Sequence, residues 1–212
     1  DLQKLEKLLN KVGDLVITNS MMSQSVENLP NSEEKKNLLE KINLFQRYIV
    51  ELQDYATDIR MIKFESMYTI YNDIIQEILP SNKSIKLQII GTETKVDKSL
   101  IEHLDLSIKT LITNSVLYGI ETTKERTAKD KNPEATIKII AQQLNGQMLF
   151  CIEDDGIGFD KDELDFEEDF PKITEDNQLK NVYTIKENVE KLNGNIEIKS
   201  DLEEGFSLTM TV

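Results

Sequence analysis

The chain has a single cysteine, Cys151, and a single histidine, His103, among its 212 residues. One cysteine excludes an internal disulfide and favours a reducing compartment. No cysteine or carboxylate cluster surrounds His103 in the sequence, so we expect a plain surface side chain rather than a metal or catalytic site. Cys151 lies in an apolar run without a thiolate-activating partner, so we expect a buried strand residue.

Positive charge and long apolar runs are also scarce. Lys and Arg number 25 against 39 Asp and Glu, a formal net charge of -14. This balance argues against a nucleic-acid surface and against binding to anionic lipid. No apolar run reaches the roughly 18 residues of a membrane-spanning helix, and no secretory leader is recognisable. We therefore expect a cytoplasmic protein or fragment, with no nucleic-acid partner and no membrane insertion.

The first sixty residues repeat apolar side chains with the period of a helix. The pattern predicts one amphipathic helix over residues 2 to about 27, which Leu29-Pro30 ends. Asn31, with Glu34 three residues later, resembles a capping box at the start of a second long helix, whose apolar face continues to Ile59. Two long helices with a short connection form an antiparallel hairpin.

Such a hairpin has little against which to bury its apolar stripe. Pairing with a second copy would make a four-helix bundle, so we expect a homodimer. The alternative is that the hairpin packs on the chain's own downstream domain. Because the composition changes at residues 58–62, we predict a helical-hairpin dimerisation domain over residues 1–63 and a second domain over residues 64–212.

The second domain mixes helical and strand patterns. Helices are predicted over residues 64–79, 98–118 and 179–192, and strands over residues 85–90, 136–143, 147–153, 195–199 and 206–212. Asn145-Gly146 indicates a tight hairpin between two of these strands. We predict loops over residues 121–134 and over the acidic residues 160–178. The fold class is therefore α+β, a sandwich with helices on one face of a mixed, mostly antiparallel sheet.

The segment from Cys151 to Asp160 has the strongest pattern of a binding site. Its strand ends in Asp-x-Gly-x-Gly, formed by Asp154, Gly156 and Gly158. This pattern places a carboxylate at a sheet edge and lets the backbone turn closely around a ligand, because glycine has no Cβ. The alternative is a simple turn, since Asp-Gly is a common turn pair. The lack of a directly following strand, and a matching helix upstream, favour the site.

Several segments together resemble the CheA-type chemotaxis histidine kinases. Residues 5–17 are similar to the opening of the family's dimerisation helix. Residues 111–114 with 118–121 resemble the N box of its GHKL (Bergerat) ATP-binding domain, and residues 153–158 resemble the first glycine box. The resemblance implies a dimeric four-helix bundle followed by a Bergerat-type α/β sandwich.

The resemblance also implies ATP and Mg²⁺ as cofactors and assigns residues to them. Asp154 would accept a hydrogen bond from the adenine amino group, since an ionised carboxylate is acceptor-only. Gly156 and Gly158 would leave room for the ring. Asn114 would place its amide oxygen on Mg²⁺, a cation that prefers oxygen ligands. Alternatively, Asn114 is a helix residue bonded to its own backbone.

Some residues depart from the family pattern around the N box. Thr110 replaces the acid/base residue four positions before Asn114, and a threonine hydroxyl does not titrate near neutral pH. Leu117 and Tyr118 replace the family's Asp and His. Lys63 replaces the usual proline at the hinge between the two domains.

Further departures concern the triphosphate. The three positions of the second glycine box fall on Asn177, Leu179 and Asn181, where glycines would let backbone N–H groups hold phosphate. The intervening lid is shortened and acidic over residues 160–169, which would repel a polyanionic nucleotide. Phe206 replaces a threonine beside the adenine.

Together these departures remove the base, the phosphate site, the lid and part of the adenine contact. We predict a degenerate CheA-like kinase core that acts in two-component signalling as a dimeric protein-binding scaffold, with weak or no ATP binding and no catalytic residue. The alternatives are a functional ATP-dependent histidine kinase core that lacks its phosphoacceptor domain, and a histidine-phosphotransferase or response-regulator-binding protein derived from a kinase. Expected partners are a second copy and a response regulator or other chemotaxis signalling protein.

Overall fold

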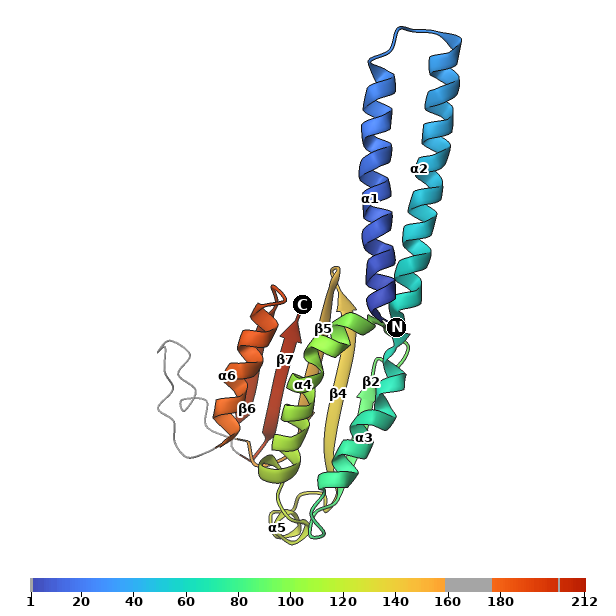
Figure 1. The fold of residues 1–212 in the computed structure, drawn as a ribbon. Helices are drawn as coiled ribbons and strands as arrows, with labels where there is room; N and C mark the ends of the chain where they lie inside the picture. The colour runs from blue at the N-terminus through green and yellow to red at the C-terminus, as the bar shows by residue number, and fades with distance from the viewer. Residues whose placement is uncertain (1, 159–176, 202) are drawn as a thin grey trace. The chain divides into compact units, whose positions relative to one another are not determined.

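The computed structural model describes residues 2–158, 177–201 and 203–212 (Figure 1). The chain divides into two compact units, one of residues 1–62 with 97–99 and the other of residues 63–96 with 100–212. Because residues 97–99 group with the first unit, the boundary at residue 63 stays a prediction. The acidic loop predicted over residues 160–178 falls outside the described residues up to residue 176.

The first unit is a hairpin of two long helices, α1 (Leu2–Glu27) and α2 (Glu33–Arg60), which lie side by side in Figure 1. The predicted bounds of the first helix are confirmed. The predicted cap of the second, Asn31, is wrong. The helix begins at Glu33, so Ser32 is the residue whose side chain reaches an unpaired helical N–H, that of Lys35 at 3.2 Å.

Both helices repeat their buried residues every seven positions. Val12, Asn19 and Val26 are buried on α1, and Ile42, Ile49 and Ala56 on α2. This heptad spacing is typical of helices that pack along a shared seam. The hairpin therefore buries one side of each helix within itself.

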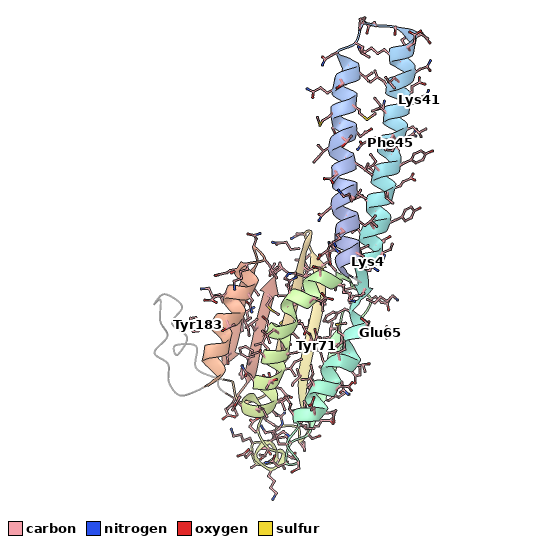
Figure 2. The ribbon with its side chains drawn as sticks, in the orientation of Figure 1. Lys4, Lys41, Phe45, Glu65, Tyr71 and Tyr183 are labelled. Carbon is pink, nitrogen blue, oxygen red and sulfur yellow. The ribbon has the colours of Figure 1, made fainter. Side chains whose placement is uncertain are left out.

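A second set of apolar side chains follows the same seven-residue spacing but stays 38–70% exposed. We name this set the exposed stripe. Its members are Leu8, Leu15 and Met22 on α1, Leu29 in the connection after α1, and Leu38, Phe45, Leu52 and Ile59 on α2. Phe45 is labelled in Figure 2. The hairpin thus has a second apolar surface that it does not bury within itself.

The second unit contains a five-stranded sheet in the order β2-β4-β5-β7-β6. The strands are β2 (Ile85–Ile90), β4 (Ala135–Leu144), β5 (Gln147–Asp154), β7 (Gly205–Thr211) and β6 (Asn195–Asp201). Strands β2 and β4 are parallel, and the other neighbouring pairs are antiparallel. The predicted α+β class with a mixed, mostly antiparallel sheet is confirmed.

The helices of this unit lie against one face of the sheet (Figure 1). The three longest are α3 (Met67–Ile78), which follows the short turn η1 (Phe64–Ser66), α4 (Lys98–Asn114) and α6 (Asn177–Glu190). The short strands β1 (Met61–Lys63) and β3 (Lys95–Asp97) lie outside the main sheet. Alternate strand residues such as Ile137, Ile152 and Leu208 are fully buried on the face that the helices cover. Tyr71 of α3, labelled in Figure 2, is also fully buried. The period-two pattern of the sequence therefore identified the core face.

Most turns follow the sequence, with one omission. Asn145 and Gly146 have positive φ angles of 51° and 85°, which confirms the tight hairpin between β4 and β5. Residues 121–134 are not loop throughout, because α5 (Thr123–Ala128) forms inside them. A capping box of Thr122 and Glu125 begins α5, and this signature is present in the sequence.

We predict that Ser32→Ala destabilises the hairpin by about 1 kcal/mol, because the Lys35 N–H loses its side-chain acceptor. Thermal denaturation followed by circular dichroism measures the change. Asn31→Ala is the matched control, and it should leave the melting curve in place. The reverse order of effects would contradict Ser32 as the cap.

Candidate functional site

Asp154 is the last residue of β5 and is almost fully buried, at 8% exposure. Its Oδ2 accepts a hydrogen bond from the Ser115 hydroxyl at 2.6 Å, and its Oδ1 accepts one from the Gly156 backbone N–H at 3.0 Å. Burial raises the pKa of the Asp154 carboxyl, and these two hydrogen bonds oppose that rise. The sequence predicted Asp154 as a site residue, but not Ser115 as its partner.

Ser115 comes from a π-helical turn, η2 (Ser115–Gly119), that directly continues α4. The wider turn ends at Gly119, one residue after the predicted end of the helix, and Gly119 is not among the glycines with positive φ. Lys83 donates to the carbonyl oxygens of Val116 and Leu117, both at 2.9 Å, and so satisfies two of the exposed carbonyls at this helix end. The turn η2 is thereby held to the segment that precedes β2.

Gly119 and Gly156 approach each other closely. A Cβ on Gly156 would lie 2.1 Å from the Gly119 carbonyl oxygen, and a Cβ on Gly119 would lie 3.3 Å from Asp154 Oδ2. Gly158, by contrast, has a positive φ of 62°, a conformation that favours glycine. The two predicted glycines are therefore needed for different reasons, Gly156 for space and Gly158 for its backbone angle.

A group of charged residues holds the turn after Asp154. Arg126 is 1% exposed and donates to Glu121 Oε2 at 3.1 Å and to the Asp155 carbonyl at 3.0 Å. Lys131 donates to Glu121 Oε1 and to the Gly156 carbonyl, both at 2.8 Å. We name Glu121, Arg126, Lys131 and Asp155 the Glu121 cluster. It ties the residues after β5 to α5 and to the end of η2.

Within this cluster, burial alone would raise the pKa of Glu121. The hydrogen bond from Lys131 and the charges of Lys131 and Arg126 outweigh that effect, so the pKa of Glu121 lies below its usual value. Glu121 is therefore ionised at neutral pH and anchors both cations. Sequence reasoning missed Arg126 and Lys131 because it interpreted residues 121–134 as loop.

Asn114, the predicted magnesium ligand, is the last residue of α4 and is half-buried. It directly precedes Ser115, so the structure brings Asn114 and Asp154 to the same end of the sheet. Among the described residues, no group of three His, Cys, Asp or Glu side chains could hold a metal ion. A metal at this site would thus depend on the Asn114 amide oxygen and on the phosphates of a nucleotide.

The departures from the family pattern lie around this end. Thr110 is half-buried on α4, one turn before Asn114, whereas Leu117 and Tyr118 are exposed on η2 at 38% and 44%. Phe206 stands opposite Asp154 in the β5–β7 ladder. Helix α6 begins at residue 177 rather than at the predicted residue 179, so the three positions of the second glycine box lie within its first turns.

A cavity of about 410 Å³ borders Asp154 but is not the predicted adenine site. Its lining includes Lys138, Glu153 and Ser207, which point to the sheet face opposite the buried core because strand side chains alternate. The Asp154 carboxylate faces Ser115 on the helical side instead. His103 is exposed on α4 and Cys151 is buried on β5, as predicted.

Two family models match the chain. The model for the homodimeric domain of signal transducing histidine kinases matches residues 1–59, and the model for histidine kinase-, DNA gyrase B- and HSP90-like ATPases matches residues 100–212, more than half of the chain. The chain belongs to this ATPase family. The order of dimerisation domain and GHKL ATPase domain is that of a CheA-type histidine kinase core, as the sequence predicted.

Relatives support the same assignment. The chemotaxis protein CheA of Rhizobium meliloti (strain 1021) is 35% identical over 167 residues, covering 77% of this chain and 22% of that protein. CheA of Listeria monocytogenes serovar 1/2a is 30% identical over 196 residues, covering 92% and 30%. The chain thus spans less than a third of the length of these relatives.

The blue-light activated histidine kinase of Erythrobacter litoralis EL346 shares the fold, with a TM-score of 0.51, 16% identity, and coverage of 98% of this chain and 59% of that one. Across the described part of this GHKL core, no helix combines the length and the apolarity needed to cross a bilayer.

We predict that Gly156→Ala destabilises the second unit by about 1–3 kcal/mol, because the new Cβ meets the Gly119 carbonyl and the turn must shift. Urea denaturation measures the change. Gly13→Ala is the matched control, since a Cβ there meets nothing within 4 Å and alanine favours a helix interior, which stabilises α1 by about 1 kcal/mol. An unchanged midpoint for Gly156→Ala would contradict the close approach.

We predict that Arg126→Ala lowers the free energy of unfolding of the second unit by about 3 kcal/mol, because it leaves the buried Glu121 and the Asp155 carbonyl without a major partner. The midpoint of urea denaturation tests this. Lys129→Ala removes a cation from the same region, but its pair with Glu203 is exposed at 42% and 56%, so the midpoint should barely change. Equal effects from the two variants would show that the Glu121 cluster does not stabilise the turn.

Proposed function

We propose that this chain is a degenerate CheA-like kinase core, which acts in chemotaxis or two-component signalling as a dimeric protein-binding scaffold with weak or no ATP binding. The supporting observation is the contrast between the two ends of the nucleotide site. The purine end has Asp154 in a built hydrogen-bonded environment. The other end has Thr110, Leu117 and Tyr118 around the N box in place of the family's titratable and charged groups, and it lacks the glycines of the second glycine box.

The retained purine end alone gives little affinity for a triphosphate. Each hydrogen bond to a charged group contributes about 1.5–3 kcal/mol, roughly 10- to 150-fold in affinity. Asn177, Leu179 and Asn181 stand where the family's glycines would let backbone N–H groups hold phosphate. ATP and adenosine should therefore bind with similar, weak affinities.

Dimerisation is the other half of the proposal. The exposed stripe gives each hairpin apolar side chains at heptad spacing on both helices, and a second copy of the hairpin would bury them in a four-helix bundle. The only histidine of the chain, His103, is on α4 and not on the hairpin, so the hairpin contains no phosphoacceptor of the usual chemistry. This favours a role in binding over one in phosphotransfer within a phosphorelay.

One observation favours a second candidate function, a working kinase core that phosphorylates a separate phosphoacceptor domain. Asn114 and Asp154 lie at the same end of the sheet, as an ATP site requires, and the turn at Gly156 is fully formed. A response-regulator-binding role is the third candidate, and a stable complex with a receiver domain would support it.

Calorimetric titration with Mg-ATP and, separately, with adenosine tests the proposal. We expect no dissociation constant tighter than about 1 mM for either ligand, with no advantage for the triphosphate. Micromolar binding of Mg-ATP that exceeds the affinity for adenosine and is lost in Asp154→Ala would overturn it. Lys138→Ala, on the opposite face of the sheet, is the matched control for Asp154→Ala.

A phosphorylation assay with a CheA phosphoacceptor domain complements the titration. We expect no transfer of phosphate from ATP by the unmodified chain, and none by Thr110→His, because restoring the acid/base residue does not restore the phosphate site. Phosphoryl transfer by the unmodified chain would favour the working kinase core instead.

A further inference from the structure

The packed seam of the hairpin is interrupted by one polar pair. Asn19 is 3% exposed and donates from Nδ2 to Gln46 Oε1 at 2.6 Å, joining α1 to α2 near the middle of both helices. One heptad away on either side, the equivalent α1 positions are the buried apolar residues Val12 and Val26. Asn19 therefore occupies a position where an aliphatic side chain would fit the pattern.

This pair is not fully satisfied. The Asn19 Oδ1 is buried and has no hydrogen-bond partner among the described residues. A buried amide oxygen without a donor is unfavourable, whereas an apolar side chain of similar size at the same position is not. The pair therefore lowers the stability of the seam relative to leucine, and its presence needs a reason other than stability.

The position of the pair determines how the two halves of the exposed stripe align. Met22 follows Asn19 by three residues and Phe45 precedes Gln46 by one, so in an antiparallel hairpin these two stripe residues lie within one helical turn of the same level. Because both halves repeat every seven residues, alignment at this level aligns the other three levels too. A slip of one heptad would displace them by about 10 Å.

We propose that the Asn19–Gln46 hydrogen bond fixes the register of α1 against α2, and so aligns the exposed stripe into a surface that matches a second copy of this chain. A polar residue at a single core position of packed helices specifies register and assembly state at a cost in stability. The inference rests on the homodimer proposed above, because the aligned stripe is the surface that the second copy contacts.

A register assay tests this in the full chain with Cys151→Ser. One variant carries Met22→Cys with Phe45→Cys, the aligned pair, and another carries Leu15→Cys with Phe45→Cys, one heptad out of register. A short bifunctional maleimide should link only the aligned pair. When Asn19→Leu and Gln46→Leu are added to these variants, we expect both cysteine pairs to be cross-linked. Without the engineered cysteines, the double leucine variant should have a melting temperature at least about 4 °C higher than the unmodified chain.

Assembly is measured on the same chains by light scattering and native mass spectrometry. The unmodified chain should form one dimeric species, and the double leucine variant should form a mixture of assemblies. Exchanging the two amides, as Asn19→Gln with Gln46→Asn, keeps a hydrogen-bonding pair and should keep a single dimer. Val12→Leu changes an apolar position of the same seam and should also leave the assembly unchanged.

The possible failures are distinguishable. If the double leucine variant forms a single dimer and links only the aligned cysteines, the Asn19–Gln46 pair does not set the register, although the homodimer stands. If the unmodified chain is a monomer at assay concentrations, the proposed homodimer is wrong. The proposal that a second copy contacts the exposed stripe is then wrong as well.

Discussion

The burial of one carboxylate organises the second unit. Asp154 ends β5 and is almost fully buried, and a buried carboxylate is stable only when hydrogen-bond donors surround it. The Ser115 hydroxyl and the Gly156 N–H supply them, so the end of α4 and the turn after β5 must meet at this point. Gly119 and Gly156 lack side chains where the two backbones approach, which makes the meeting sterically possible.

Side chains of the second unit hold the turn that follows Asp154. Arg126 and Lys131 hold the backbone at Asp155 and Gly156 and are themselves held by Glu121, an ionised and nearly buried anchor. A nucleotide site stabilised in this way can keep its purine end even when the phosphate contacts are lost. This arrangement supports the proposed degenerate kinase core, because Ser115 and Gly156, which hold Asp154, are not among the positions where the chain departs from the family pattern.

The hairpin follows a different physical logic. Its internal seam is apolar at Val12, Val26, Ile42 and Ile49, yet contains the Asn19–Gln46 pair at its centre. Buried amides weaken such a seam but restrict the registers that it can adopt. In the proposed homodimer, a surface that matches its own copy at four heptad levels needs a defined register more than it needs maximal stability.

The sequence by itself predicted the helical hairpin, the α+β class and the five strands of the main sheet to within two residues, because helical spacing and strand alternation are local patterns, but it did not predict β1 and β3. Its motifs also proposed Asn114, Asp154, Gly156 and Gly158 as site residues. It placed the cap of α2 one residue early and missed α5, although Ser32 and the pair of Thr122 and Glu125 were visible. Only the tertiary structure decided that Ser115 bonds Asp154, that Gly119 faces Gly156, and that Arg126 and Lys131 share Glu121. These contacts join residues from separate elements, and the distance between such residues is set by packing rather than by any pattern along the chain.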